Sequence, residues 1–419
     1  MRRWPKRALA SLLCVLASGG CPRRAAPPVP GAEPEVRVGI AVGSASVTLG
    51  GDGELFVTDD SNRQPVGRIP AGVRWSVVPD TGGLRLVRPD GSRTARYPGI
   101  SAVNVTEDRF AMVDGRRYRG RVNVVRDASG GGGGLTLMNR VPLESYVAGV
   151  IGEELGARRA GEEAAMFAQA VVSRTFAIKN RGRWEAQGFD LYADTRDQVY
   201  SGVASETAAA WQAVRGTAGQ VLRYHGELID AYFHSTSGYS TAGVEEAFKT
   251  ARPQPYLRPV SDARGGGRYY CELSPRFRWR EEWDGRKLRT ILSRTLPAVM
   301  PVGGDGLPRI TDVQVSHTTR SGRVGELRIV FEHGDVRVPG PDVRAVLRPE
   351  ADRPLSSAAF QLYVTKDGGE VTRLVAVGAG FGHGVGFCQW GAVGRARAGQ
   401  DYRAILATYF PGTTVDRLY

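Results

Sequence analysis

The apolar residues between positions 139 and 179 are spaced as they are in helices. In the first half of this stretch they recur every three or four residues, which predicts a helix with one apolar face: Leu143, Val147, Val150 and Ile151. Pro142 and Glu144 suit the first turn of this helix, where proline fits and an acid complements the helix dipole. A second helix is predicted over residues 162–181, whose many alanines permit close packing.

Glu154 is an acid on the apolar side of the first helix. It follows Val147 by two turns, whereas its neighbour Glu153 faces water. Burial penalises an ionised carboxyl and raises its pKa, so that the group stays protonated and can act as a general acid. In the alternative interpretation, Glu154 bends out to solvent at the helix end or pairs with an arginine, and Arg174 of the second helix is a candidate for that pair.

Short β-rich runs, separated by Gly, Asp and Pro turns, fill the chain from Arg37 to about Leu137 and recur after Leu288. We therefore expect an α+β fold in which β-rich parts surround a helical catalytic core with a cleft. Its expected parts are a β-rich N-terminal part (36–137), the catalytic core (138–285), a β-rich insertion (286–350) and a C-terminal part that completes the cleft (351–419).

Residues 378–387, GAGFGHGVGF, alternate glycine with larger side chains. As a strand, this segment would place four glycines on one face and His383 on the other: Gly380, Gly382, Gly384 and Gly386. Alternate glycines indicate the close approach of a ligand or another backbone segment, and His383 is either structural or catalytic there. Gln389 and Trp390 follow; they suit hydrogen bonding to a sugar and stacking on one, or else simply pack locally.

The N-terminus has the pattern of a secretory signal. A basic start, an apolar core at residues 8–17 and small residues before Cys21 predict a signal peptide over residues 1–20. Cys21 also resembles a bacterial lipoprotein cleavage site, so lipid attachment at Cys21 and simple cleavage nearby are both open. The Pro/Ala-rich residues 21–35 read as an extended tether, and no later apolar run is long enough to cross a membrane.

The chain is strongly basic, with a net charge of +13. A basic surface can meet nucleic acid, anionic lipid or an anionic wall polymer. No segment resembles a nucleic-acid-binding motif, so we expect no nucleic-acid partner and favour the wall or the membrane surface for an exported chain.

Export also bears on the two cysteines that follow Cys21, namely Cys271 and Cys388. In an exported chain they most simply form one disulfide. A zinc site with His234 and His383 is conceivable, but the close paired spacing of zinc ligands is missing, so we expect no metal cofactor. His234 begins the polar segment HSTSG, and the absence of a GxSxG elbow argues against a serine hydrolase of that type.

Five segments, in this order, together resemble the bacterial stage II sporulation protein D / LytB family (SpoIID domain): VPLESYVAGVIGEEL, AQAVVSRTFA, YFHSTSG, PYLRPV and GFGHGVGFCQWGA. The resemblance implies a SpoIID-like fold and places the family's catalytic glutamate on Glu154. The polar residues of the family motifs, implied to bind substrate, fall on Arg174, His234, Ser235, Ser237 and His383. The chain departs from the family pattern at Gly156, at Tyr239, and at Ser240, near which some members hold zinc through a cysteine.

The resemblance implies a peptidoglycan lytic transglycosylase that cleaves the bond between N-acetylmuramic acid and N-acetylglucosamine. The muramyl 6-hydroxyl attacks in place of water and gives a 1,6-anhydro product, so one carboxyl, Glu154, can act as acid and then as base. The alternative from the same family is a non-catalytic glycan-binding protein that enhances a cell-wall amidase. Expected partners are therefore glycan strands and, in that alternative, the amidase. The expected location is the periplasm or cell envelope, with membrane attachment only through a lipid on Cys21.

Overall fold

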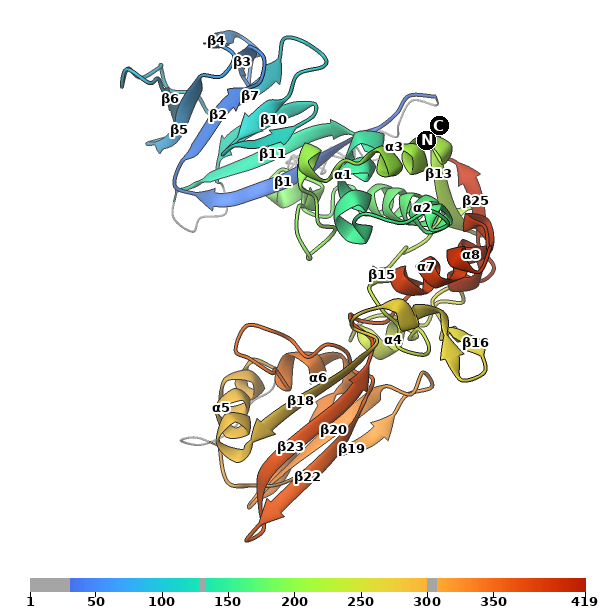
Figure 1. Cartoon of the computed structure of the whole chain (residues 1–419). Coiled ribbons are helices and arrows are strands. Elements are labelled where there is room, and N and C mark those ends of the chain that lie inside the picture. Colours follow the sequence, from blue (N-terminus) through green and yellow to red (C-terminus); the bar gives the residue numbers. More distant parts are fainter. Residues whose placement is uncertain (1–30, 128–132, 300–306) are drawn as a thin grey trace, which may run out of the picture.

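The computed structural model describes residues 31–127, 133–299 and 307–419 (Figure 1). The predicted signal peptide, Cys21 and most of the predicted tether lie outside the described residues. Within those three ranges, no helix is both long enough and apolar enough to span a membrane.

The N-terminal part is built from antiparallel strands, as the β-rich runs predicted. They are β1 (Glu35–Ser44), β2 (Val47–Gly51), β3 (Leu55–Asp59), β4 (Pro65–Ile69), β5 (Arg74–Asp80), β6 (Gly83–Val87), β7 (Gly99–Asn104), β8 (Ala111–Val113), β9 (Arg116–Tyr118), β10 (Arg121–Arg126) and β11 (Leu135–Pro142). One sheet has the order β6-β5-β2-β8-β9. The other has the order β12-β1-β11-β10-β7-β3-β4, where β12 (Leu191–Tyr192) pairs parallel with β1. In β3 every second residue is buried, as expected of a strand with one face on a core.

The helical core follows directly. Its helices are α1 (Leu143–Leu155), α2 (Glu163–Lys179), α3 (Ala208–Gly216), α4 (Val244–Ala247), α7 (Gln389–Arg397) and α8 (Tyr402–Tyr409), with 3-10 turns η1 (Glu185–Gln187), η2 (Gly202–Ser205) and η3 (Tyr270–Leu273). Its strands are β13 (Gln220–Tyr224), β14 (Glu227–Leu228), β15 (Phe233–His234), β16 (Ala263–Gly265), β17 (Arg268–Tyr269), β24 (Phe387–Cys388) and β25 (Thr414–Arg417). The two predicted helices are confirmed as α1 and α2.

Helix α2 joins two hydrophobic cores. Met166 and Ala170 pack with α1 and the N-terminal sheets, whereas Ala168 and Val171 pack with α7 and α8. Figure 1 shows α2 between these two groups of helices. Its small alanine side chains allow this close packing on both sides, because each helix approaches the α2 backbone without large side chains in between.

A third part, here called the insert lobe, comprises residues 278–379. It contains β18 (Arg278–Asp284), α5 (Gly285–Thr295), η4 (Leu296–Ala298), β19 (Ile310–Thr318), β20 (Val324–Phe331), β21 (Gly334–Pro339), α6 (Gly340–Val346), β22 (Phe360–Asp367) and β23 (Glu370–Ala379). Its sheets have the orders β18-β23-β22 and β19-β20-β21, and they enclose a separate core around Trp283 and Leu327. The insertion thus extends beyond the expected range 286–350, because β23 pairs with β18 and β22 pairs with β23, and neither strand joins the C-terminal part.

The insert lobe is fixed to the helical core by buried polar contacts. The guanidinium of Arg323, at the start of β20, donates to the backbone carbonyls of Ser237 (3.1 Å) and Ser240 (2.8 Å). At the surface, Lys249 of the core forms an ion pair of 2.7 Å with Asp342 of α6.

The predicted strand over residues 378–387 is wrong for most of its length. Strand β23 ends at Ala379, and Gly380, Gly382, Gly384 and Gly386 all have φ between 71° and 110°. These angles are left-handed and favour glycine. The predicted close backbone approach is confirmed, since a Cβ on Gly380 would lie 2.5 Å from the carbonyl oxygen of Thr236 and one on Gly386 would lie 2.3 Å from that of Tyr232.

Candidate active site

A pocket of about 850 Å³ lies where the helical core meets the insert lobe. The end of α1 contributes Glu154, and residues 230–235 and 381–383 form much of its wall. Gln389, the first residue of α7, also lines it, and the insert lobe contributes Arg344. The pocket therefore depends on segments far apart in the sequence.

Glu154 is held in the last turn of α1, just before Gly156 ends the helix with a φ of 63°. Its carboxylate accepts hydrogen bonds from the backbone N–H of Val199 and from Nε2 of Gln389, both at 3.2 Å. Burial raises the pKa of Glu154, while these two hydrogen bonds oppose the rise. The prediction of an acid on the apolar face is confirmed, and among the described residues Glu154 forms no ion pair with an arginine.

Gln389 is engaged within the protein, whereas we expected its side chain to bind a sugar. Its amide donates to Glu154, and it also donates to Oε1 of Gln169 at 3.4 Å. Gln169 in turn donates to Oγ of Ser173 at 3.0 Å, so both side chains of α2 are polar members of a buried chain. In the sequence, Gln169 is only a polar residue among the packing alanines of the second helix. The chain of amides fixes the orientation of the Glu154 carboxyl.

His383 lies on the pocket wall, and both of its ring nitrogens are engaged. Nδ1 accepts from the N–H of Val385 at 3.1 Å, so Nε2 carries the proton and donates to the carbonyl of Phe233 at 2.8 Å. Burial is the main cause that lowers the pKa of His383 to about 4, with nearby arginine charge adding to it. His383 is therefore neutral near pH 7 and, as arranged here, structural.

His234 lies beside it, with the two ring centroids 5.6 Å apart. Its Nδ1 contacts the carbonyl of Val385 at 3.1 Å and so is the donor, whereas Nε2 is buried without a hydrogen-bond partner among the described residues. Burial lowers the pKa of His234 well below its ordinary value, which leaves Nε2 as an acceptor.

The remaining predicted residues divide between the pocket and the interior. Ser235 lines the pocket, but Ser237 is completely buried outside it and donates to Asp262 at 2.9 Å. Trp390 also lies outside the pocket lining, with the guanidinium of Arg158 5.0 Å above its ring. Neither Ser237 nor Trp390 is thus positioned to touch a molecule in this pocket.

Arg174 is also outside the pocket, and it is completely buried. Its guanidinium pairs with Glu144 at 2.6 Å. Glu144 and Glu154 are ten residues apart on α1, roughly 15 Å along the helix axis, so one arginine cannot serve both. The structure therefore assigns Arg174 a structural ion pair in place of the expected substrate contact.

Comparison with known proteins bears directly on this arrangement. Residues 131–224, which include α1, α2 and Glu154, match the family model described as stage II sporulation protein (SpoIID). The chain carries a SpoIID domain. Residues 267–386, which include the insert lobe, match a model described as a domain of unknown function, DUF8618.

Several relatives are similar to this chain over most of its length. An uncharacterized protein of Brachyspira hyodysenteriae is 29% identical over 67% of the chain and 68% of the relative. The stage II sporulation protein D of Bacillus subtilis is 28% identical over 66% of the chain and 75% of that protein. The amidase enhancer of the same organism is 26% identical over 75% of the chain, but only 46% of that protein is covered.

Other charged groups in the pocket were missed in the sequence. Arg183, Arg252 and Arg344 line it together with Asp197. The Asp197 carboxylate is already engaged, because it accepts from Nε1 of Trp184 at 2.8 Å and pairs with Arg183 at 3.0 Å. Only the fold reveals these residues, since Arg183, Asp197 and Arg252 lie in irregular loops with no periodic pattern and Arg344 lies in α6 of the insert lobe, far from Glu154 in the sequence.

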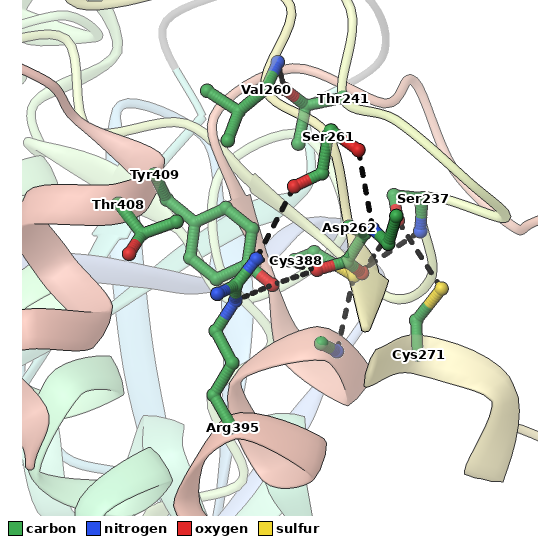
Figure 2. Close-up of polar contacts among 12 residues, drawn as sticks. Ser237, Thr241, Val260, Ser261, Asp262, Cys271, Cys388, Arg395, Thr408 and Tyr409 are labelled. Carbon is green, nitrogen blue, oxygen red and sulfur yellow. Dashed lines mark hydrogen bonds and ion pairs between the residues drawn. The ribbon is translucent and has the colours of Figure 1, made fainter. Parts of the chain in front are cut away.

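The predicted disulfide is not formed. Cys271 and Cys388 are both free and buried (Figure 2). The sulfur of Cys388 accepts from the backbone N–H groups of Ser237 and Gly391, each at 3.2 Å, at the N-terminus of α7. Burial raises the pKa of Cys388 well above its ordinary value, so it is not a reactive nucleophile.

Proposed function

We propose that this protein acts on the bacterial cell wall as a peptidoglycan lytic transglycosylase, with Glu154 as its general acid and base. The observation that carries the proposal is the setting of Glu154: a half-buried carboxyl in the pocket wall, held by Val199 and Gln389, with a pKa raised by burial. A raised pKa increases the protonated fraction of a carboxyl at a given pH, as a general acid requires.

The proposed reaction needs one such carboxyl. Glu154 gives its proton to the glycosidic oxygen, the bond from that oxygen to C1 of N-acetylmuramic acid breaks, and N-acetylglucosamine leaves with a free hydroxyl. The Glu154 carboxylate then takes the proton of the muramyl 6-hydroxyl as its oxygen bonds to C1. The product is a 1,6-anhydro ring, no water is consumed, and Glu154 is protonated again.

The surroundings of Glu154 suit this scheme better than a two-carboxylate hydrolysis. Glu153 is exposed, and neither Glu153 nor Asp194 lines the pocket. Asp197 and Asp230 do line it, but the Asp197 carboxylate is bound to Arg183 and Trp184, and the Asp230 carboxylate accepts from the hydroxyl of Tyr256 at 3.4 Å. The hydroxyl of Ser235 is a candidate for contacts with sugar hydroxyls, and the pocket arginines suit an anionic polymer.

A second candidate function is that of a non-catalytic enhancer of a cell-wall amidase. It is favoured by the similarity to a protein named amidase enhancer. Under either function, glycan strands are the proposed ligand, and an exported protein of the periplasm or cell envelope is the proposed location. A cell-wall amidase is a partner only under the second.

Mass spectrometry of purified glycan strands, digested with the purified chain, tests the proposal. We expect 1,6-anhydro-muramyl ends from the wild type and only background levels from Glu154→Gln, since an amide cannot donate and retrieve the proton. Glu153→Gln is the matched control, because it makes the same change one residue away on the exposed face, and it should cleave normally. Release of anhydro ends by Glu154→Gln at a rate close to wild type would reject the catalytic assignment.

An amidase assay then separates the two candidates. If Glu154→Gln still stimulates a cell-wall amidase as well as wild type does, and the wild type releases no anhydro ends, the enhancer function replaces the enzymatic one.

A further inference from the structure

Asp262, Cys271 and Cys388 bring three potential metal ligands together in the interior (Figure 2). One carboxylate oxygen and the two sulfurs all lie within 4.8 Å of one another, and all three residues are fully buried. They come from the loop before β16, from η3 and from the N-cap of α7. None lines the pocket, so the cluster has no part in the reaction proposed above.

Hydrogen bonds at the cluster are directed at both sulfurs, which act as acceptors. The sulfur of Cys388 accepts from two backbone N–H groups, those of Ser237 and Gly391, at 3.2 Å each. The hydroxyl of Ser237 lies 3.3 Å from the sulfur of Cys271. A neutral thiol is a weak acceptor, whereas a thiolate gains from each N–H directed at it, as at other helix N-termini.

A bound cation would balance the charge of the cluster once both thiols give up their protons to it. Asp262 accepts from Arg395 at 3.2 Å and from the hydroxyl of Tyr409 at 2.7 Å, as Figure 2 shows. Two thiolates and one carboxylate carry three negative charges, and Arg395 offsets one of them. A buried charge without compensation is strongly unfavourable, so a dication is needed for the thiolate form. Thiolate sulfurs with one carboxylate oxygen are ligands that suit zinc.

We propose that Asp262, Cys271 and Cys388 bind one Zn²⁺ ion at a buried structural site. The hydroxyl of Ser237, which lies 2.9 Å from an oxygen of Asp262 and 3.3 Å from the sulfur of Cys271, would hold these ligand atoms in place by hydrogen bonds. This ion would tie the segment around η3 to the start of α7. Because Gln389 directly follows Cys388, the ion would also fix the residue that orients Glu154.

The sequence argued against a metal because its ligands are not closely paired along the chain. The fold supplies the pairing instead: the parallel bridge between β15 and β24 sets Cys388 beside the HSTSG segment, and η3 packs against α7. The two histidines that the sequence offered as ligands are not part of the cluster.

Metal analysis of the full chain, purified without chelators, tests the site. We expect stoichiometric zinc in the wild type and its loss in Cys271→Ser and in Cys388→Ser. His333→Gln is the control, because His333 is an exposed potential ligand elsewhere, and it should keep the zinc. Ser237→Ala keeps all three ligands and should weaken zinc binding by roughly 10–100-fold in competition with a chelator.

Peptide mapping after alkylation supplies a second measurement that does not depend on the variants folding. In the native wild type, the peptides holding Cys271 and Cys388 should resist alkylation until a chelator is added, and then both should react. The wild type loaded with Co²⁺ should show thiolate-to-metal absorption.

Two results would overturn the proposal. A disulfide-linked pair of peptides without bound metal would show that the cysteines are oxidised to each other. Metal-free wild type that also fails to bind added Zn²⁺ or Co²⁺ would show two plain buried thiols. Both outcomes are independent of whether glycan is cleaved.

Discussion

Removing the charge of Glu144 tests whether Arg174 is a structural residue. Arg174 is completely buried and donates from Nε and Nη2 to the two oxygens of Glu144, at 2.9 and 2.6 Å. The Glu144 side chain is only 13% exposed. Glu144→Gln keeps its size but leaves a buried guanidinium without its counter-charge. Breaking a buried pair in this way costs about 3–5 kcal/mol, and we expect that loss in the free energy of unfolding.

Urea unfolding followed by circular dichroism measures this loss. For a cooperative unit of about 150–250 residues, the thermal midpoint should also fall by about 6–20 °C. Asp335→Asn is the matched control, because Asp335 forms a similar two-point contact with Arg328 at the surface, with side chains 27% and 36% exposed. Its cost should stay below about 1 kcal/mol.

Two further variants sharpen the test. Arg174→Met alone should be strongly destabilising, whereas Arg174→Met combined with Glu144→Leu should recover much of the loss, because no unpaired charge remains. Cleavage of glycan by any variant that stays folded should be nearly normal. An Arg174→Met protein of normal stability that no longer cleaves or binds glycan would refute the structural assignment and restore the expected substrate contact.

Three other predictions concern the pocket. Burial raises the folded-state pKa of Glu154, so the wild type should lose stability relative to Glu154→Gln as the pH rises through that pKa. In urea unfolding, the free energy of unfolding of the wild type should fall relative to that of Glu154→Gln between about pH 4 and about pH 8. An equal difference between the two proteins at both pH values would contradict the raised pKa. Gln389→Met removes a hydrogen-bond donor that lowers the pKa of Glu154, so the alkaline limb of the pH–activity profile should move to higher pH. We also expect kcat to fall roughly tenfold with little change in KM. An alkaline limb at the same pH as in the wild type would show that Gln389 does not influence the pKa of Glu154. The imidazole NMR signals of His383 should stay those of the neutral ring from about pH 7 to about pH 5, and a titration near 6.5 would contradict the pKa of about 4.

The sequence predicted what depends on local periodicity. The helical spacing around Val147 and Val150 is strong, and α1 and α2 form where expected, with Glu154 on the buried face. The β-rich N-terminal part follows from its short runs and turns in the same way. These features are set by neighbours a few residues apart, so a single sequence reveals them.

Features that depend on distant partners were not predictable in this way. The sequence left open whether Arg174 pairs with Glu154, and only the packing of α2 on α1 pairs it with Glu144. From the sequence, Gln389 suited a hydrogen bond to a sugar or a local contact, and only the fold shows that its amide donates to Glu154. The alternation of residues 380–386 satisfied a strand pattern, although the positive φ of the glycines rules out strand geometry.

The insert lobe leaves and re-enters the helical core at one point. Arg278 at the start of β18 is the direct cross-strand partner of Ala379 at the end of β23. Opposed residues in an antiparallel pair lie about 5 Å apart, a gap that a two-residue turn can close. Residues 279–378 therefore form a cassette: exchanging or deleting them leaves an unbroken chain from η3 to α7, with Glu154 and Gln389 still on the core. Such an exchange would alter the pocket wall that carries Arg344. The length of polymer that the pocket contacts can therefore change in evolution while Glu154 stays in place.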